Sequence, residues 1–167
     1  TDFDYPSFWK HSLVSSITSR LIAHEILPAQ EEDVFFLGLL HDLGILTLAQ
    51  CLPDQYALVL REREKSLSSY YEVENQILGF NHQDVGEVLL RSWGFPDSFC
   101  VPIKFHHCPE RLQTDQPEIL SLTRILHLSS LFTDFFDHRE KGLYLGLLEW
   151  YAKDYGLLEH LDLDRII

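Results

Sequence analysis

The stretch Phe36-Leu37-Gly38-Leu39-Leu40-His41-Asp42-Leu43-Gly44 joins an apolar run to an abrupt polar break. Acidic residues precede the run, and the helix dipole makes negative charge favourable at the start of a helix. We therefore expect a helix over residues 31–40, a break over 41–44, where Gly44 helps the backbone turn, and a short helix over 45–52. A histidine and an aspartate that are adjacent at a helix end can direct both side chains into one cavity.

Outward from this break, apolar residues recur at helical spacing, with little of the alternation typical of strands. Further helices are expected from near Pro6 to before Pro28 and over residues 53–65, 69–78, 82–93, 97–106, 117–136 and 143–155. One side of the first helix is expected to face the core through Phe8, Leu13, Ile17, Leu21 and Ile22. Short connections between about eight helices predict a single all-α domain over residues 1–167, folded as a compact bundle.

Composition excludes several classes of function. The 167 residues carry 13 basic and 26 acidic side chains, a formal charge of −13. Such an acidic chain is not expected to bind nucleic acid or an anionic membrane through charge. The longest uninterrupted apolar run covers only residues 34–40, whereas a membrane span needs about 20 residues. We therefore expect neither a nucleic-acid nor a membrane partner.

The cysteines bear on the compartment of the protein, and the lack of methionine bears on the extent of the chain. The three cysteines, Cys51, Cys100 and Cys108, form no CxxC motif and cannot all pair with one another. This pattern favours a reducing, cytoplasmic environment without a disulfide framework. The sequence contains no methionine, so we interpret it as a fragment of a longer protein.

Nine histidines are the most distinctive chemical feature. Five of them stand beside helix ends or turns, close to acidic residues and glycines: His11, His41, His82, His106 and His107. Together with Asp42 they offer imidazole and carboxylate ligands, which suit a divalent first-row metal. The alternative is a hydrogen-bonded histidine core without metal. The other four, His24, His127, His138 and His160, are expected to be ordinary hydrogen-bonded residues.

Several motifs, in this order and spacing, resemble the HDOD family, the HD-related output domain of bacterial signalling proteins. They are Phe8-Trp9-Lys10-His11-Ser12, residues 36–44 as quoted above, Glu74, Leu78-Gly79-Phe80-Asn81-His82-Gln83-Asp84-Val85-Gly86, Trp93-Gly94-Phe95-Pro96, and His106-His107-Cys108-Pro109. The resemblance covers residues 8 to 109 and implies the compact helical bundle of HD domains.

HDOD domains are similar to HD phosphohydrolases and to HD-GYP phosphodiesterases, in which a metal-bound water attacks phosphorus. Carried over residue by residue, the resemblance implies a set of metal ligands that consists of His11, His41, Asp42, His82, His106 and His107. The cofactor it implies is a divalent transition metal such as Fe, Mn, Zn or Ni.

The sequence departs from the enzymes at groups that handle substrate or metal. Ile45 stands where the enzymes carry a lysine after the glycine, and Ser130 stands where they carry a metal-binding aspartate. Asp134 and Asp137, one and two turns later, would need a shifted helix to reach the site. The Gly-Tyr-Pro motif after His107 is also missing.

These departures favour a non-catalytic output or regulatory domain that retains the means to bind metal. Its expected partners are signalling proteins or attached sensory domains, and an oligomer is compatible with the sequence. The alternative is a metal-dependent phosphohydrolase that acts on a nucleotide or cyclic dinucleotide. A third hypothesis is a metal-carrying sensor that binds a small ligand without turnover.

Overall fold

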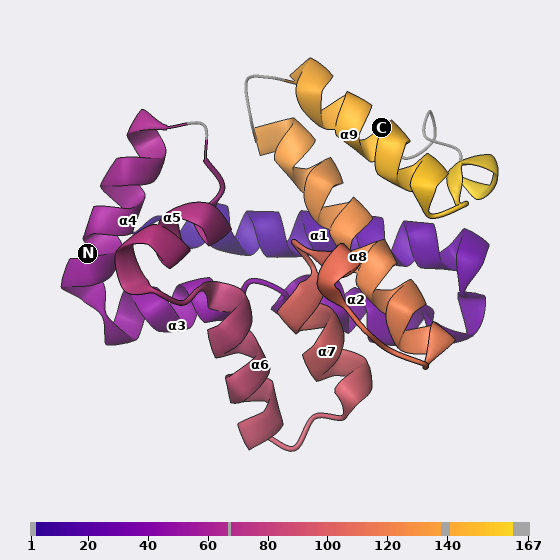
Figure 1. Cartoon of the computed structure of the whole chain (residues 1–167), viewed down its shortest axis with the longest axis horizontal. Helices are drawn as coiled ribbons and strands as arrows, with labels where there is room; N and C mark the ends of the chain where they lie inside the picture. Colours follow the sequence, from indigo (N-terminus) through magenta and orange to yellow (C-terminus); the bar gives the residue numbers. More distant parts are fainter. Residues whose placement is uncertain (1–2, 67, 138–140, 162–167) are drawn as a thin grey trace.

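A computed structural model describes residues 3–66, 68–137 and 141–161 of the protein (Figure 1). Within these ranges all regular structure is helical, which confirms the predicted all-α class. The described residues contain nine α-helices, and each corresponds to one of the ranges expected from the sequence. The elements are α1 (Tyr5–Ile26), η1 (Pro28–Gln30), α2 (Glu31–Leu40), α3 (Leu43–Cys51), α4 (Pro53–Lys65), α5 (Tyr70–Leu78), α6 (His82–Ser92), α7 (Asp97–Phe105), η2 (Pro109–Arg111), α8 (Pro117–Asp137), α9 (Lys141–Asp154) and η3 (Leu158–His160).

Helix α1 runs along the long axis of the molecule and packs against α2 and α8 (Figure 1). The side it buries is mostly hydroxyl-bearing: Phe8, Ser12, Ser15, Ser16, Thr18, Ser19, Ile22 and Ala23. The prediction that the apolar side of α1 faces the core is therefore wrong for three of its five residues. Leu13, Ile17 and Leu21 lie on the outer side, where 46–49% of each residue is exposed.

Close packing explains why serines face inward. A Cβ atom at Gly38 of α2 would lie 2.6 Å from Ser16 Cα, so the two helices touch almost backbone to backbone. Leucine or isoleucine side chains would not fit such a contact. The hydroxyl of Ser19 donates to Ser129 Oγ of α8 at 2.6 Å, so this hydroxyl is hydrogen-bonded although it is buried.

The segment Pro28–Cys51 is the one stretch of the described chain whose length and mean hydropathy, 1.6, would allow a membrane span. It is longer than the uninterrupted apolar run of residues 34–40, from which no membrane span was expected. Half of its apolar window is buried in the protein. A turn at residues 41–42 divides the segment into α2 and α3. Because buried core helices meet the same criterion, this feature is weak evidence for a membrane.

Gly44 sets the contact between α3 and α6. A Cβ atom at Gly44 would lie 2.0 Å from the backbone oxygen of His82. Gly44 lies within α3 and does not have a positive φ, so the expected role in turning the backbone is wrong. Its role is to let α3 approach the first turn of α6, which places Asp42 near His82.

Two of the histidines expected to be ordinary are hydrogen-bonded. His24 Nδ1 lies 2.7 Å from Glu31 Oε1, and His127 Nδ1 lies 2.6 Å from the Tyr155 hydroxyl, which ties α8 to the end of α9. His138 lies outside the described residues, as does the side chain of His160.

His127 should make the metal-free protein less stable in acid. Burial lowers its pKa to about 3, whereas an unfolded histidine titrates near 6.5. Between these values the unfolded chain binds the extra proton, so stability is complete above pH 6.5 and falls as the pH drops. We expect His127→Asn to reduce the slope of unfolding free energy against pH by about 1.4 kcal/mol per pH unit between pH 6 and 4, as measured by urea denaturation. Identical slopes in the two proteins would contradict this.

Candidate metal centre

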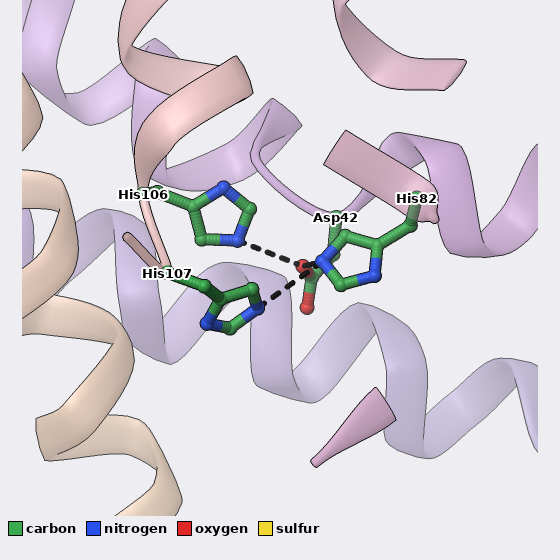
Figure 2. A group of neighbouring side chains, drawn as sticks. All are labelled: Asp42, His82, His106 and His107. Carbon is green, nitrogen blue, oxygen red and sulfur yellow. Dashed lines mark hydrogen bonds and ion pairs between the residues drawn. The ribbon is translucent and has the colours of Figure 1, made fainter. Parts of the chain in front are cut away.

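Asp42 stands at the N-cap of α3, but its side chain makes no capping hydrogen bond. An aspartate at this position ordinarily accepts from the backbone of the first turn. Here the carboxylate instead faces the imidazoles. Its Oδ1 lies 3.5 Å from His82 Nε2 and 3.6 Å from His106 Nε2 (Figure 2). Its Oδ2 lies 3.2 Å from His41 Nε2 and 3.4 Å from His11 Nε2.

The same kind of hydrogen bond within the helix orients His41 and His106. Each caps the C-terminus of its helix, α2 or α7, and each uses Nδ1 to contact the carbonyl oxygen three residues earlier. The Nδ1 atoms lie 2.7 Å from Gly38 O and 2.8 Å from Ile103 O. A carbonyl can only accept a hydrogen bond, so Nδ1 donates and the neutral ring presents a lone pair at Nε2.

His82, the first residue of α6, is oriented by a buried acid. Its Nδ1 lies 2.7 Å from Glu74 Oε2 of α5, and both side chains are fully buried. His82 Nε2 lies 3.1 Å from His107 Nε2 (Figure 2). With Nδ1 donating to Glu74, neutral His82 has a lone pair at Nε2. A proton on either Nε2, or one ion bound by both, satisfies the pair.

All six predicted ligands come together in two overlapping groups. The first consists of Asp42, His82, His106 and His107, and the second of His11, His41 and Asp42; the candidate ligand atoms within each group lie within 4.8 Å of one another. Asp42 belongs to both and presents a different oxygen to each. Separations of 3.1–3.6 Å match those between ligands that surround one ion at about 2 Å.

The protonation states favour a cation. Burial lowers the pKa of His106 to about 4, and burial followed by the charge of His106 holds the pKa of His107 well below its ordinary value. Although burial opposes it, the imidazoles of His41, His106 and His82 hold the pKa of Asp42 well below its usual range. At neutral pH the carboxylate is therefore charged while His106 and His107 are neutral, as metal ligation requires.

His82 differs from its neighbours. Burial alone would lower its pKa, but the carboxylate of Glu74 and then that of Asp42 raise it above the ordinary value. Protons therefore compete with a metal for His82 more than for His106 and His107.

Unsatisfied polar atoms test whether these residues fit a metal. Among the described residues, His41 Nε2, His106 Nε2 and Asp42 Oδ1 are buried without a hydrogen-bond partner. Leaving such groups unpaired costs about 1–3 kcal/mol each. A divalent ion held by Asp42, His82, His106 and His107 would satisfy His106 Nε2 and Asp42 Oδ1, and one held by His11, His41 and Asp42 would satisfy His41 Nε2, so the donor sets fit a metal.

A pocket of about 720 Å³ opens beside the cluster. His11, Asp42, His82 and His107 form part of its lining. Three basic side chains, Lys10 from α1 and Arg61 and Arg63 from α4, also line it. Arg63 is held over the ring of Tyr70, with its Cζ atom 4.0 Å from the ring centroid.

Both departures from the enzyme pattern lie in the wall of this pocket. Ile45 and Ser130 are buried pocket residues, so an apolar side chain and a neutral hydroxyl replace the expected lysine and aspartate. Asp134 also lines the pocket, although it belongs to neither ligand group. Burial raises the pKa of Asp134 to about 6.

The structure thus places the six predicted residues at one site, and their binding of a metal stays a prediction. No site role was predicted from the sequence for Tyr56 and Glu74, which support His82, or for the three basic pocket residues. Glu74 appeared only as one residue of the family resemblance. No periodicity or local motif marks these contacts, because each joins different helices.

The fold and the site define an all-helical domain of the HD type with a histidine–aspartate cluster. The HDOD domain family matches residues 1–109, and the chain belongs to this family. No curated protein matches the chain.

Several solved structures share the fold. A provisionally assigned phosphohydrolase from Shewanella amazonensis SB2B is 21% identical, with a TM-score of 0.72 over 91% of this chain and 55% of its own. The response regulator MmoQ from Methylococcus capsulatus is 26% identical, with a TM-score of 0.69 over 98% of this chain and 62% of its own. An HDOD domain protein from Geobacter sulfurreducens is 20% identical, with a TM-score of 0.71 over 95% and 54%. This chain therefore spans little more than half the length of these neighbours.

Proposed function

We propose that this chain is a regulatory domain of a bacterial cytoplasmic signalling protein, that it binds a divalent first-row transition metal, and that it acts without turning over a substrate. One arrangement carries the proposal. Pre-oriented imidazoles surround Asp42, but the adjoining pocket wall has Ile45 and Ser130 where the similar enzymes have a lysine and an aspartate.

Loss of those two groups weakens the case for hydrolysis more than the case for binding. The lysine would steady a phosphate through its charge, and Ile45 has none. The imidazoles and Asp42, by contrast, retain their orientation and their charge states. The likeness to a response regulator at 26% identity supports a signalling role.

The positions of the ligands suggest how the domain would act. His41 and Asp42 lie between α2 and α3, His82 starts α6, and His106 and His107 follow α7. A bound ion would supply cross-links among these helix ends. Such an ion at 100 times its Kd would stabilise the folded domain by about 2.7 kcal/mol. A partner protein or an attached domain would respond to the arrangement of helices that the bound ion fixes.

A second candidate, a metal-dependent phosphohydrolase, is favoured by one observation. Lys10, Arg61 and Arg63 line the pocket beside the cluster and could hold a phosphate in place of the missing lysine. In that case His41 and Asp42 would hold the metal, and a nucleotide or cyclic dinucleotide would be the substrate.

Metal analysis and a turnover assay test the two candidates together. We expect the purified protein to contain Mn, Fe, Ni or Zn, or to bind one of them with a rise in melting temperature. With the metal bound, we expect no hydrolysis of phosphodiesters or cyclic dinucleotides above the level of Asp42→Ala. Turnover that Asp42→Ala abolishes would establish the phosphohydrolase and overturn the regulatory proposal. Absence of any metal binding would leave a histidine core instead.

A further inference from the structure

Glu74 is a fully buried acid that belongs to neither ligand group. Its Oε1 accepts a hydrogen bond from the Tyr56 hydroxyl at 2.7 Å. Its Oε2 accepts two, from the backbone N–H of His82 at 2.8 Å and from Nδ1 of the same residue at 2.7 Å. Desolvating a carboxylate costs several kcal/mol unless such bonds compensate. A carboxylate buried at this cost, with two of its three bonds to one candidate ligand, points to a role at the cluster.

We propose that Glu74, held in place by Tyr56, is the positioning residue of the metal centre: it fixes the Nε2 lone pair of His82 towards Asp42 and supplies the second negative charge of the buried site. This inference rests on the metal binding proposed above.

The geometry supports the positioning part. A carboxylate can only accept, so Nδ1 of His82 must donate and Nε2 carries the lone pair whenever the ring is neutral. Because the ring and the backbone N–H of His82 bond to the same oxygen, Glu74 fixes the ring relative to the start of α6. His41 and His106 obtain the same tautomer from neutral carbonyls of their own helices, so Glu74 gives His82 a charged support that they lack.

Charge supports the second part. A divalent ion buried among neutral imidazoles needs compensating negative charge, and the ligand Asp42 supplies one. Glu74 supplies another through His82, and a carboxylate on the far nitrogen also makes the imidazole a stronger donor to a metal. Removing the charge of Glu74 should therefore weaken binding even when its hydrogen bonds survive.

Tyr56 connects this support to α4. It is 1% exposed and belongs to α4, the helix that also contributes Arg61 and Arg63 to the pocket lining. The contacts Tyr56–Glu74–His82 therefore connect α4 to a candidate metal ligand through buried groups alone.

Calorimetric titration with Zn²⁺ or Mn²⁺ alone tests the proposal in three variants. Glu74→Gln keeps the shape, and its amide oxygen can still accept from His82, so only the charge is lost. We expect its metal affinity to fall about 10–100-fold, the usual effect of losing such a support. Tyr56→Phe keeps the charge and should lower the affinity less. Glu72→Gln, an exposed change on the same helix that preserves its capping box, should leave the affinity unchanged.

A second measurement tests the tautomer of His82 directly. In the metal-free protein at pH 8, ¹⁵N chemical shifts should show His82 protonated at Nδ1 in the wild type and in Glu74→Gln. The proposal would be overturned if His82 of the wild type carried its proton at Nε2 instead.

The possible failures are distinguishable. If the wild type binds no metal, the proposed function and this inference both fail. If the wild type binds and a folded Glu74→Gln variant binds equally tightly, only the inference fails. If Glu74→Gln does not fold, Tyr56→Phe decides, and an affinity equal to that of the wild type would count against the proposal.

Discussion

The substitution Asp42→Asn is expected to lower metal affinity by at least about 100-fold, the upper end of what losing one support of a ligand costs. Asp42 is the one residue shared by both candidate ligand groups, and its two oxygens face different pairs of imidazoles. Asparagine removes the charge and replaces one oxygen with an amide nitrogen, which does not ligate. Both groups therefore lose a ligand through a single change. Calorimetry with Mn²⁺, Zn²⁺ or Ni²⁺ measures the effect.

Asp33→Asn provides a matched control for this experiment. Asp33 is an exposed residue in the first turn of α2, and its substitution changes the net charge by the same amount. We expect the control to bind metal with the affinity of the wild type. If Asp42→Asn also retained that affinity, the metal would bind elsewhere on this acidic protein, and the cluster would be a hydrogen-bonded core.

The second large effect is expected from Gly44→Ala, which should destabilise the protein by about 3 kcal/mol and weaken metal binding. The new Cβ atom would lie 2.0 Å from the carbonyl oxygen and 2.7 Å from the carbonyl carbon of His82. Backbone atoms cannot rotate out of the way, so α3 and the start of α6 would have to separate. That movement would pull Asp42 and His82 apart. Urea denaturation of the metal-free protein and metal titration of the same sample give both quantities.

Gly146→Ala tests whether this effect comes from the contact or from the loss of a glycine. A Cβ atom at Gly146, within α9, would meet nothing within 4 Å. Replacing a glycine within a helix by alanine ordinarily stabilises it by about 0.5–1 kcal/mol, so the control should be at least as stable as the wild type. Equal stability of the two alanine variants would show that α3 and α6 tolerate a wider separation than the structure indicates.

Helix α1 shows where periodicity misleads. The spacing of Phe8, Leu13, Ile17, Leu21 and Ile22 predicts a helix, and the helix is present. It does not predict which side is buried, because this depends on how closely a neighbouring helix approaches. Gly38 on α2 brings the two backbones so close that serines fit between them, and three of the five apolar residues lie outside.

The ligand set was open to prediction for a different reason. The histidines and the aspartate beside helix ends, and their order along the chain, can be read directly from the sequence. The resemblance to HDOD domains then indicated that residues from these distant segments form one ligand set. Glu74 has no such local mark of its role. Its support of His82 depends on α5 and α6 meeting at one angle, and its bond from Tyr56 depends on the position of α4.

The amino-acid sequence by itself thus determines the helical class, the breaks between helices and the identity of the candidate ligands. These follow from the spacing of apolar residues, from capping residues and from side-chain chemistry. Which nitrogen each imidazole presents, which oxygen of Asp42 each one meets, and which basic residues line the adjoining pocket depend on folding. These properties come from contacts between residues far apart in sequence, and the packing of whole helices decides them.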